Sequence, residues 1–302
     1  MRFMRLKQTL MHKTTSVIGL KKGEVNLIPH QKAWVEEAQS MIRALHLLFG
    51  EDALDIQHIG STAVSTIKAK PIIDLAMKVK NFEPIKAKIE ALENLGFIYY
   101  PHVDLPNAMY FNRRVNNGSV STHHLHVFHE ASQEWKNHLY FRDALREDKA
   151  LALAYDTLKD KLQNKYRFDR PNYTEKKAEF IQYVIRKFQV KRFLGKTVTM
   201  KVDRPIGAIH PKHDKLIYPI NYGYIKGEIA PDGEELDVYL LGVDEVVTSY
   251  TGKIIAIIHR ENDAEDKLVM APSDQKFTAK AIKDRTHFQE QYYTSTIQLF
   301  DK

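Results

Sequence analysis

Four acidic side chains lie within six residues of one another in the segment "APDGEELDV" of this 302-residue chain. Asp232 and Glu234 are two residues apart, so on a strand they would point to the same side, and Asp237 can join them if the segment bends. Carboxylate oxygens are the usual ligands of hard cations such as Mg²⁺, which often bind phosphate substrates at the same time. The same residues also suit an exposed turn, so a metal site and a solvated turn both remain open interpretations.

A second group of candidate residues lies in "HIGSTAVSTIKAKPIIDL". Gly60 and Ser61 follow an apolar segment and can present a backbone N–H and a hydroxyl to a phosphate. Asp74 interrupts an apolar run, where a carboxylate is costly to bury unless it is paired or bound to a metal, and Lys70 adds positive charge nearby. On these residues alone, a satisfied core aspartate beside surface lysines is the favoured interpretation. A phosphate-binding site in which Asp74 is a catalytic or metal-binding residue is the alternative.

Histidines and arginines elsewhere could complete that site. In "THHLHVF", His124 and His126 share one face of a predicted strand, while His123 points the other way. Imidazole can bind phosphate or a transition metal, although it favours softer metals than Mg²⁺. The candidate phosphate-binding arginines are Arg113, Arg114 and Arg142.

Helices and strands predicted from hydrophobic periodicity must position these residues. Residues 30–49 have the apolar spacing of a helix, and the nearly continuous apolar run at 71–79 predicts a buried strand. We therefore expect a mixed α/β domain followed by helices. The other predicted elements of this half are strands at 54–59, 108–115 and 122–129, a helix at 83–96 and mostly helical structure from 132 to 190.

The character of the sequence changes after Val190. Short β-type segments separated by turn signals, such as "KTVTMKV", "DVYLL" and "GKIIAIIHR", predict a small β-barrel with long loops. Residues 196–302 contain 14 Lys and Arg against 17 Asp and Glu, which leaves 31 against 21, a net charge of +10, for the rest of the chain. We therefore predict two domains, residues 1–190 and 195–302, with the boundary in "KRFLGK".

Composition excludes several classes of function. The chain has no cysteine, so disulfides, thiolate nucleophiles and zinc–thiolate sites are excluded. The basic start lacks the apolar core of a secretory signal, and no run of about 18 apolar residues could span a membrane, so we expect a cytoplasmic protein without a membrane partner. A formal net charge of +7 would suit nucleic acid, but no aromatic-rich basic strand or recognition helix stands out, so nucleic-acid binding is not expected.

The segment "YPINYGYI" followed by "DGEELDV" resembles the signature region of the soluble family I inorganic pyrophosphatases, and the resemblance covers about residues 195–302. In that family three aspartates bind Mg²⁺ and activate the water that attacks pyrophosphate. The resemblance implies metal-ligand roles for Asp232, Glu234 and Asp237. It places Glu234 in the position of the catalytic base, where the family has aspartate. Tyr222 matches a phosphate-contacting tyrosine.

Two later segments extend this resemblance. "AEDKLVMAP" resembles the family segment that supplies a further acid and a phosphate-binding lysine. Lys267 fits the lysine, and Asp266 or Glu265 fits the acid, with Asp266 as the expected metal ligand. In "HFQEQYY", Tyr292 matches a substrate-binding tyrosine, whereas Tyr293 stands where the family has lysine. The implied cofactor is Mg²⁺, with Mn²⁺ as an alternative, and the implied substrate is pyrophosphate.

The first half of the chain resembles the GrpB family, a branch of the nucleotidyltransferase superfamily, over about residues 16–190. "HIGSTAVSTIKAKPIIDL", "THHLHVF" and "YFRDALR" carry the resemblance. The superfamily pattern is Gly-Ser, a spacer and two acids two residues apart. Gly60, Ser61 and Asp74 fit this pattern, but Ala76 stands in place of the second acid. The resemblance implies a nucleotide or another phosphate ligand, and similar domains fused to dephospho-CoA kinase suggest a link to coenzyme A metabolism.

Three functional hypotheses remain open at this point. In the first, a nucleotidyltransferase-like module releases pyrophosphate and the fused module hydrolyses it with Mg²⁺. In the second, both modules bind nucleotides or phosphate without catalysis and have a regulatory role. In the third, the basic module binds nucleic acid. Release of phosphate from pyrophosphate distinguishes the first hypothesis from the second.

Overall fold

The computed structural model describes residues 18–103, 107–211 and 213–300. The chain divides into two compact units between Ile181 and Gln182, within helix α8. We call them the N-terminal unit and the C-terminal unit, and the domain limits at 190 and 195 remain a prediction. No helix in the described ranges is long and apolar enough to cross a membrane. The basic start that was considered as a signal lies outside these ranges.

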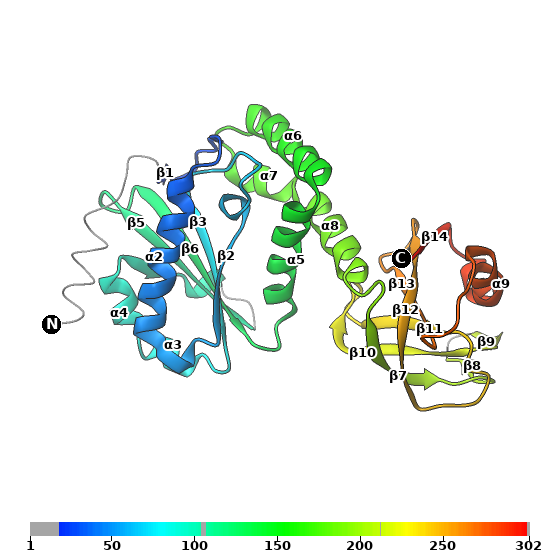
Figure 1. The fold of residues 1–302 in the computed structure, drawn as a ribbon. Helices are drawn as coiled ribbons and strands as arrows, with labels where there is room; N and C mark the ends of the chain where they lie inside the picture. Colours follow the sequence, from blue (N-terminus) through cyan, green and yellow to red (C-terminus); the bar gives the residue numbers. More distant parts are fainter. Residues whose placement is uncertain (1–17, 104–106, 212, 301–302) are drawn as a thin grey trace. The chain divides into compact units, whose positions relative to one another are not determined.

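A six-stranded sheet forms the centre of the N-terminal unit (Figure 1). Its strand order is β2-β3-β6-β5-β4, and β1 pairs with β6. β3 and β6 run parallel, whereas β2–β3, β5–β6 and β4–β5 are antiparallel pairs. The strands are β1 Leu20–Lys21, β2 Asp55–Ile59, β3 Ile73–Val79, β4 Phe97–Tyr99, β5 Ala108–Val115 and β6 Val120–His129.

Helices cover both faces of this sheet (Figure 1). The apolar stripe of α2, which includes Trp34 and Met41, packs on one face, and Trp135 of α5 packs on the other against Ala76. The helices are α2 Lys32–Phe49, α3 Glu83–Lys86, α4 Ile89–Asn94, α5 Gln133–Glu147, α6 Lys149–Lys165, α7 Arg170–Glu175 and α8 Ala178–Lys191. Short 3₁₀ turns are η1 Gly50–Asp52, η2 Ser61–Ala63 and η3 Pro101–Val103.

The alternation of β3 determines which side chains face away from α2. Leu75 and Met77 belong to the core beneath α2. Asp74 therefore points to the opposite face, because successive side chains on a strand alternate. The parallel register pairs Asp74 with His124, and His126 lies two residues further along the same face of β6. The sheet thus places one carboxylate and two imidazoles side by side.

Five strands of the C-terminal unit close into a small barrel. They pair in the order β13-β11-β10-β7-β12, and a further pairing between β12 and β13 closes the circle. Its interior is filled by aliphatic side chains such as Val238, Ile254 and Leu268. β14 adds to β12, and β8 and β9 form a separate hairpin. The elements are β7 Thr197–Arg204, β8 Ile209–His210, β9 His213–Ile217, β10 Asn221–Ile229, β11 Glu235–Leu240, β12 Ser249–Arg260, β13 Lys267–Ala271, α9 Ala279–Glu290 and β14 Ser295–Leu299.

The predicted fold class, a mixed α/β domain with following helices and then a small β-barrel, is confirmed. Two helices differ in detail. The segment at 83–96 forms α3 and α4 with a break at residues 87–88, and the last helical segment of the first half is divided into α7 and α8 at residues 176–177.

Candidate functional sites

Gly60 lets the carboxylate of Asp74 approach the turn that follows β2. Gly60 has a φ of 68°, a left-handed conformation that favours glycine. A Cβ atom on Gly60 would lie 2.6 Å from Oδ2 of Asp74, too close for any other residue. Ser61 starts the 3₁₀ turn η2, and its hydroxyl forms a hydrogen bond with Tyr155. The Gly-Ser pair therefore lies beside the carboxylate, as a tight turn between two strands.

Asp74 and His124 form a close pair at the centre of this face. His124 Nδ1 lies 2.8 Å from Asp74 Oδ1, and the two side chains are 11% and 31% exposed. Burial alone would raise the pKa of Asp74. The hydrogen bond with His124 and the positive charge of Lys70 outweigh burial and hold that pKa below its usual range. Asp74 is therefore an ionised acceptor.

The other nitrogen of His124 faces a guanidinium group. Nη2 of Arg170 lies 3.4 Å from His124 Nε2. Because arginine can only donate, His124 Nε2 accepts, and its Nδ1–H donates to Asp74. Asp74 thus fixes the orientation and the tautomer of the imidazole.

Two lysines lie on the same side of the cluster. The ammonium groups of Lys70 and Lys177 lie 5.4 and 4.5 Å from the ring centroid of Tyr173. Burial lowers the pKa of Lys70 to about 7, and the positive charges of Arg170 and Lys177 add to this effect. Burial likewise lowers the pKa of Lys177 to about 8, although the charge of Asp74 opposes this. We call Asp74, His124, Lys70, Arg170 and Lys177 the Asp74 cluster.

The Asp74 cluster contains more positive than negative groups. Three of its side chains are cationic when protonated, and Asp74 is its single carboxylate. Within the described residues, the ammonium of Lys70 has no hydrogen-bond or ion-pair partner. Burial is the main cause of the lowered pKa values of the two lysines, and repulsion from neighbouring cations adds to it. The arrangement is therefore suited to an anion.

His126 lies deeper on the same face and remains neutral. Its ring packs 5.1 Å from Tyr110 and 5.4 Å from His138, measured between ring centroids. Burial, together with the charge of the neighbouring His138, lowers the pKa of His126 to about 3. An uncharged imidazole here contributes shape rather than charge.

The predicted phosphate-binding arginines do not all reach this cluster. Arg113 pairs with His123 in the β5–β6 register and so lies on the face covered by α2, where its Nε donates to the carbonyl oxygen of Leu95 at 2.9 Å. Arg142 is held by Gln57 and the backbone carbonyl of His58. The structure therefore does not bring Arg113 together with Gly60, Ser61 and Lys70, because strand alternation turns it away.

The described parts of the chain contain no group of three or more His, Asp or Glu side chains that could hold a metal ion. Asp74 is committed to His124, and the rings of His124 and His126 are 6.5 Å apart and nearly perpendicular. The metal-binding role of these three residues therefore remains a prediction.

In the C-terminal unit, Asp237 accepts hydrogen bonds from two of the predicted site residues. The hydroxyl of Tyr222 donates to Asp237 Oδ2 at 2.5 Å, and the ammonium of Lys267 contacts the same oxygen. Lys267 also forms a buried ion pair with Glu265, whose other oxygen accepts the backbone N–H of Asp237 at 3.0 Å. We call Tyr222, Asp237, Glu265 and Lys267 the Lys267 cluster.

Burial and close packing shift the pKa values of groups in the Lys267 cluster. Burial raises the pKa of Glu265, and the negative charge of Asp237 acts in the same direction against the attraction of Lys267. Burial together with the nearby Asp237 also raises the pKa of Tyr222 well above its usual value. The phenol therefore stays protonated and remains a hydrogen-bond donor.

Asp232 and Glu234 lie in an exposed turn rather than beside Asp237. The turn connects β10 and β11, and the carbonyl oxygen of Glu234 accepts the N–H of Ala230 at 2.8 Å. Asp232 Oδ1 accepts the N–H of Glu234 at 3.0 Å. Gly233 between them has a φ of 91°, so this stretch is a turn and not a strand. The expected convergence of the three acids is not present in this arrangement.

Two more expected members lie elsewhere. Tyr292 is 67% exposed and lines a cavity of about 690 Å³ between the β8–β9 hairpin and the end of α9. Asp266 is fully buried on the other side of the strand from Lys267 and accepts from His259 Nδ1 at 2.7 Å and from Lys187 at 2.8 Å. Glu265 is therefore the acid beside Asp237, because residues two apart on a strand share a face.

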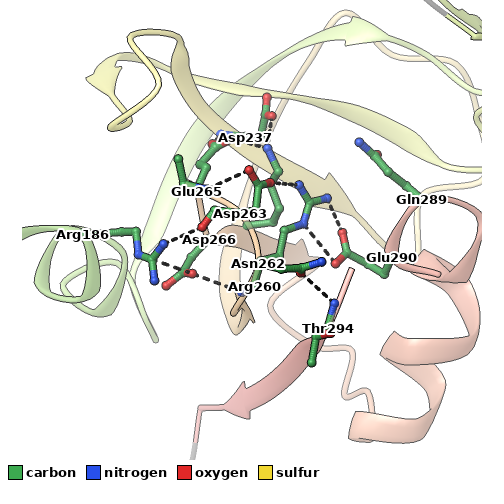
Figure 2. Close-up of polar contacts among 12 residues, drawn as sticks. Arg186, Asp237, Arg260, Asn262, Asp263, Glu265, Asp266, Gln289, Glu290 and Thr294 are labelled. Carbon is green, nitrogen blue, oxygen red and sulfur yellow. Dashed lines mark hydrogen bonds and ion pairs between the residues drawn. The ribbon is translucent and has the colours of Figure 1, made fainter. Parts of the chain in front are cut away.

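A second internal cation lies near this cluster. Figure 2 shows Arg260 between Asp263 and Glu290, with a contact of 2.7 Å to Asp263 Oδ2 and of 2.5 Å to Glu290 Oε1. The guanidinium also lies 3.7 Å from the ring centroid of Tyr293, at the position where the pyrophosphatase family has lysine. The buried acids of this region are thus neutralised by protein cations.

Sequence reasoning missed several members of the Asp74 cluster. Arg170 and Lys177 lie about 100 residues after Asp74 in the chain and reach it only through the packing of α7 on the N-terminal unit. The local sequence Arg170-Pro171 is typical of the start of a helix and indicates nothing about a site.

Family models match both parts of the chain. A model described as "GrpB protein" matches residues 24–187, and a model described as "Inorganic pyrophosphatase" matches residues 160–302. The glutamate-rich protein GrpB of Alkalihalophilus pseudofirmus is 32% identical over 171 residues, which cover 56% of this chain and 98% of that protein.

Solved structures resemble each unit to different degrees. GrpB from Enterococcus faecalis is 32% identical with a TM-score of 0.50, covering 54% of this chain and 96% of that one. The inorganic pyrophosphatase of Ehrlichia chaffeensis is 16% identical with a TM-score of 0.29, covering 35% of this chain and 88% of that one.

Proposed function

This chain belongs to the GrpB family, and from that premise we propose that its N-terminal unit binds a small phosphate-containing ligand, such as a nucleotide, at the Asp74 cluster. One observation carries the proposal: Lys70, Arg170 and Lys177 gather around a single carboxylate, and Lys70 has no ion-pair partner within the described residues. A phosphate group brings the missing negative charge and several strong acceptor oxygens.

The remaining side chains have roles that follow from their contacts. Asp74 holds His124 in one tautomer, so His124 Nε2 and the guanidinium of Arg170 lie together at the edge of the cluster. The backbone at Gly60 lies beside the carboxylate and can contact a ligand as closely as a glycine turn permits, and Ser61 follows it in the chain. These groups orient an anion, and none of them needs to transfer a proton for binding.

Nucleotidyl transfer is the finer hypothesis for this unit, and the arrangement offers it little support. Such transfer uses several carboxylates to hold two metal ions on the attacking and leaving oxygens. The position two residues after Asp74 is Ala76, which packs with Trp135 in a small apolar core. Binding without transfer is therefore the function that this site supports best.

Adjacent lysines provide a matched test of the binding proposal. Lys177 lies in the Asp74 cluster, whereas its neighbour Lys176 is exposed and pairs only with Glu175. We expect Lys177→Met to weaken calorimetric binding of AMP or pyrophosphate about tenfold or more, because one charge-assisted contact is lost, and Lys176→Met to leave it within about twofold. Equal affinities in the two variants would refute the proposed site.

The second candidate function is hydrolysis of pyrophosphate by the C-terminal unit, with Mg²⁺ as the expected cofactor. The family-model match over residues 160–302 favours it, and so does the placement of Tyr222 and Lys267 around the carboxylate of Asp237. The donors as arranged do not fit a divalent ion, because Lys267 already bridges Asp237 and Glu265. We therefore derive no step of hydrolysis through a metal.

Release of phosphate from pyrophosphate tests this second candidate. If Glu234 is the general base, Glu234→Gln lowers turnover by about 10²–10⁴-fold. The neighbouring acid Glu235 is a matched control, because its carboxylate accepts the N–H of Gly227 within the hairpin. Turnover with Mg²⁺ or Mn²⁺ that is lost in EDTA supports the proposal. No phosphate from the wild type or from Glu234→Asp, which restores the residue of the family, indicates binding without hydrolysis.

A further inference from the structure

A basic cavity lies in the C-terminal unit apart from the two sites described above. It has a volume of about 580 Å³ and is bounded on one side by α8, through Arg186, Lys187 and Lys191. His259 and Gln298, from β12 and β14, bound the other side. The lining contains three cationic side chains and one carboxylate, that of Glu261. With the buried carboxylate of Asp266 at its base, the cavity has three cations against two carboxylates, which leaves a net charge of +1.

A buried carboxylate fixes the base of this cavity. The side chain of Asp266 has no exposed surface and accepts from Lys187 at 2.8 Å and from His259 Nδ1 at 2.7 Å. Burial would raise the pKa of Asp266, but the hydrogen bonds with His259 and Lys187 lower it, so it stays ionised. The other ring nitrogen of His259, Nε2, lies 3.0 Å from Oε1 of Gln298, which bounds the cavity on the same side as His259. Asp266 thus holds one lysine and one histidine in place at the edge of the cavity.

The other cations of the cavity are paired to different degrees. Figure 2 shows Arg186 directed toward Asp266 and the segment after β12, where its Nη1 donates to the carbonyl oxygen of Asp263 at 2.6 Å. The Nε of Arg186 is buried, donates no hydrogen bond within the described residues and lies 4.0 Å from Asp266 Oδ1. The side chain of Lys191 is exposed and has no partner among the described residues. Lys191 can therefore bind an anion without breaking an existing contact, and Arg186 contributes its positive charge.

The side of the cavity that α8 forms also carries an exposed aromatic ring. Tyr183 is 52% exposed, and its ring centroid lies 6.0 Å from the guanidinium carbon of Arg186 and 5.8 Å from the ammonium of Lys187. A ring flanked by cations offers a flat apolar surface next to a phosphate-binding region.

We propose that this basic cavity is a third anion site, which binds the phosphate group of a small molecule through Arg186, Lys187 and Lys191. The phosphate oxygens accept from the ammonium of Lys191, while Arg186 and Lys187 add their charge and keep their contacts with Asp263 and Asp266. All of the lining residues belong to the C-terminal unit, so the site is independent of the Asp74 cluster. It is also on the opposite side of β13 from Lys267, because Asp266 and Lys267 alternate.

A fluorescent reporter at the cavity tests this proposal on the full chain. The two tryptophans of the protein, Trp34 and Trp135, lie in the N-terminal unit, so Tyr183→Trp adds one reporter in the C-terminal unit. Pyrophosphate is the probe, and sodium chloride at equal ionic strength is the control for screening. We expect saturable quenching by pyrophosphate that chloride does not reproduce.

Two charge reversals assign the binding to this cavity. Lys191→Glu places a carboxylate at the site, and we expect about tenfold weaker pyrophosphate binding at physiological ionic strength. Lys283 of α9 is an exposed lysine outside the cavity, so Lys283→Glu changes the net charge equally and should alter affinity less than about twofold. Quenching in Tyr183→Trp is compared with that in the chain without this reporter, because pyrophosphate is also expected to bind at the Asp74 cluster.

Three results would overturn the proposal: quenching that does not saturate, equal quenching by chloride, or equal affinities in Lys191→Glu and Lys283→Glu. Calorimetry of the same two charge reversals without the reporter provides the second measurement, and it decides the matter if Tyr183→Trp does not fold.

Discussion

Replacing Lys70 with methionine should make the N-terminal unit more stable. The pKa of Lys70 falls from 10.5 to about 7 on folding, mainly through burial, so the folded unit holds this proton poorly. A decrease of about 3.5 pKa units corresponds to about 5 kcal/mol at a pH where the unfolded lysine is charged. Lys70 is partly exposed, and solvent screening reduces this figure, so we expect a gain of about 2 kcal/mol for Lys70→Met at pH 7.

The gain should depend on pH in a defined direction. Because the folded pKa of Lys70 is lower than the unfolded one, the unfolded chain binds more protons between pH 7 and 10.5, and stability rises with pH over that window. The difference between Lys70→Met and the wild type is therefore largest at pH 7 and below. It should shrink toward zero above pH 10.5, where the lysine is neutral in both states.

Lys159 provides the matched control. It is also a buried lysine with a pKa lowered to about 8 by burial, but its ammonium contacts the carbonyl oxygen of Lys68 and lies 3.3 Å from Asp156. Removing it leaves buried acceptors without a partner, so Lys159→Met should cost about 3 kcal/mol. The two substitutions thus change stability in opposite directions.

Urea unfolding followed by tryptophan fluorescence measures both effects, because Trp34 and Trp135 report on the N-terminal unit alone. We expect the unfolding midpoint to rise in Lys70→Met and to fall in Lys159→Met. A fall in both variants would mean that Lys70 makes stabilising contacts of its own. The cluster would then be complete without an anion, and the reasoning would fail.

Further outcomes follow from the other buried groups. Tyr222→Phe should lower the stability of the C-terminal unit by about 1 kcal/mol through loss of one hydrogen bond, measured by hydrogen exchange of its strands, while the exposed Tyr292→Phe changes nothing. Arg260→Met should cost about 3–5 kcal/mol in the same measurement because Glu290 stays buried without its cation, and an unchanged exchange rate would contradict this. The pKa of His126 is about 6.5 in the unfolded chain and is lowered to about 3 in the folded one, so between these pH values only the unfolded chain binds the proton. The unfolding free energy of the N-terminal unit should therefore fall as pH falls from 6.5 toward 3. A smaller slope in His126→Phe, seen by urea unfolding, checks that assignment.

Strand alternation allowed part of the first site to be predicted from sequence. A period of two, read along "PIIDLAMKV" and "THHLHVF", places Asp74, His124 and His126 on one face, and the observed register joins them. The same rule would have placed Arg113 on the opposite face, had its register with β6 been known. Register depends on long-range pairing, which one strand's sequence does not specify.

The rest of the Asp74 cluster could not be predicted for a related reason. Arg170 starts α7 and Lys177 lies in the turn between α7 and α8, so their positions depend on how these helices pack, and no local pattern encodes that packing. The pKa values of Lys70 and Lys177 are lowered only when folding buries these side chains.

The turn between β10 and β11 was not predicted correctly for a different reason. Asp232 and Glu234 were expected to share a strand face, but Gly233 turns the chain and β11 begins only at Glu235. The sequence left the choice between Glu265 and Asp266 open, and the structure places Glu265 beside Lys267 and Asp266 beside Lys187.

The uptake of protons on ligand binding tests the central claim most directly. An anion at the Asp74 cluster should restore protons to Lys70 and Lys177, whose pKa values are about 7 and about 8 without it. AMP is titrated calorimetrically into the full chain at pH 8 in two buffers of different ionisation enthalpy. The account predicts binding with uptake of about one proton, and loss of most of that uptake in Lys70→Met. Absence of AMP binding, or binding with the same proton uptake in Lys70→Met, would contradict it.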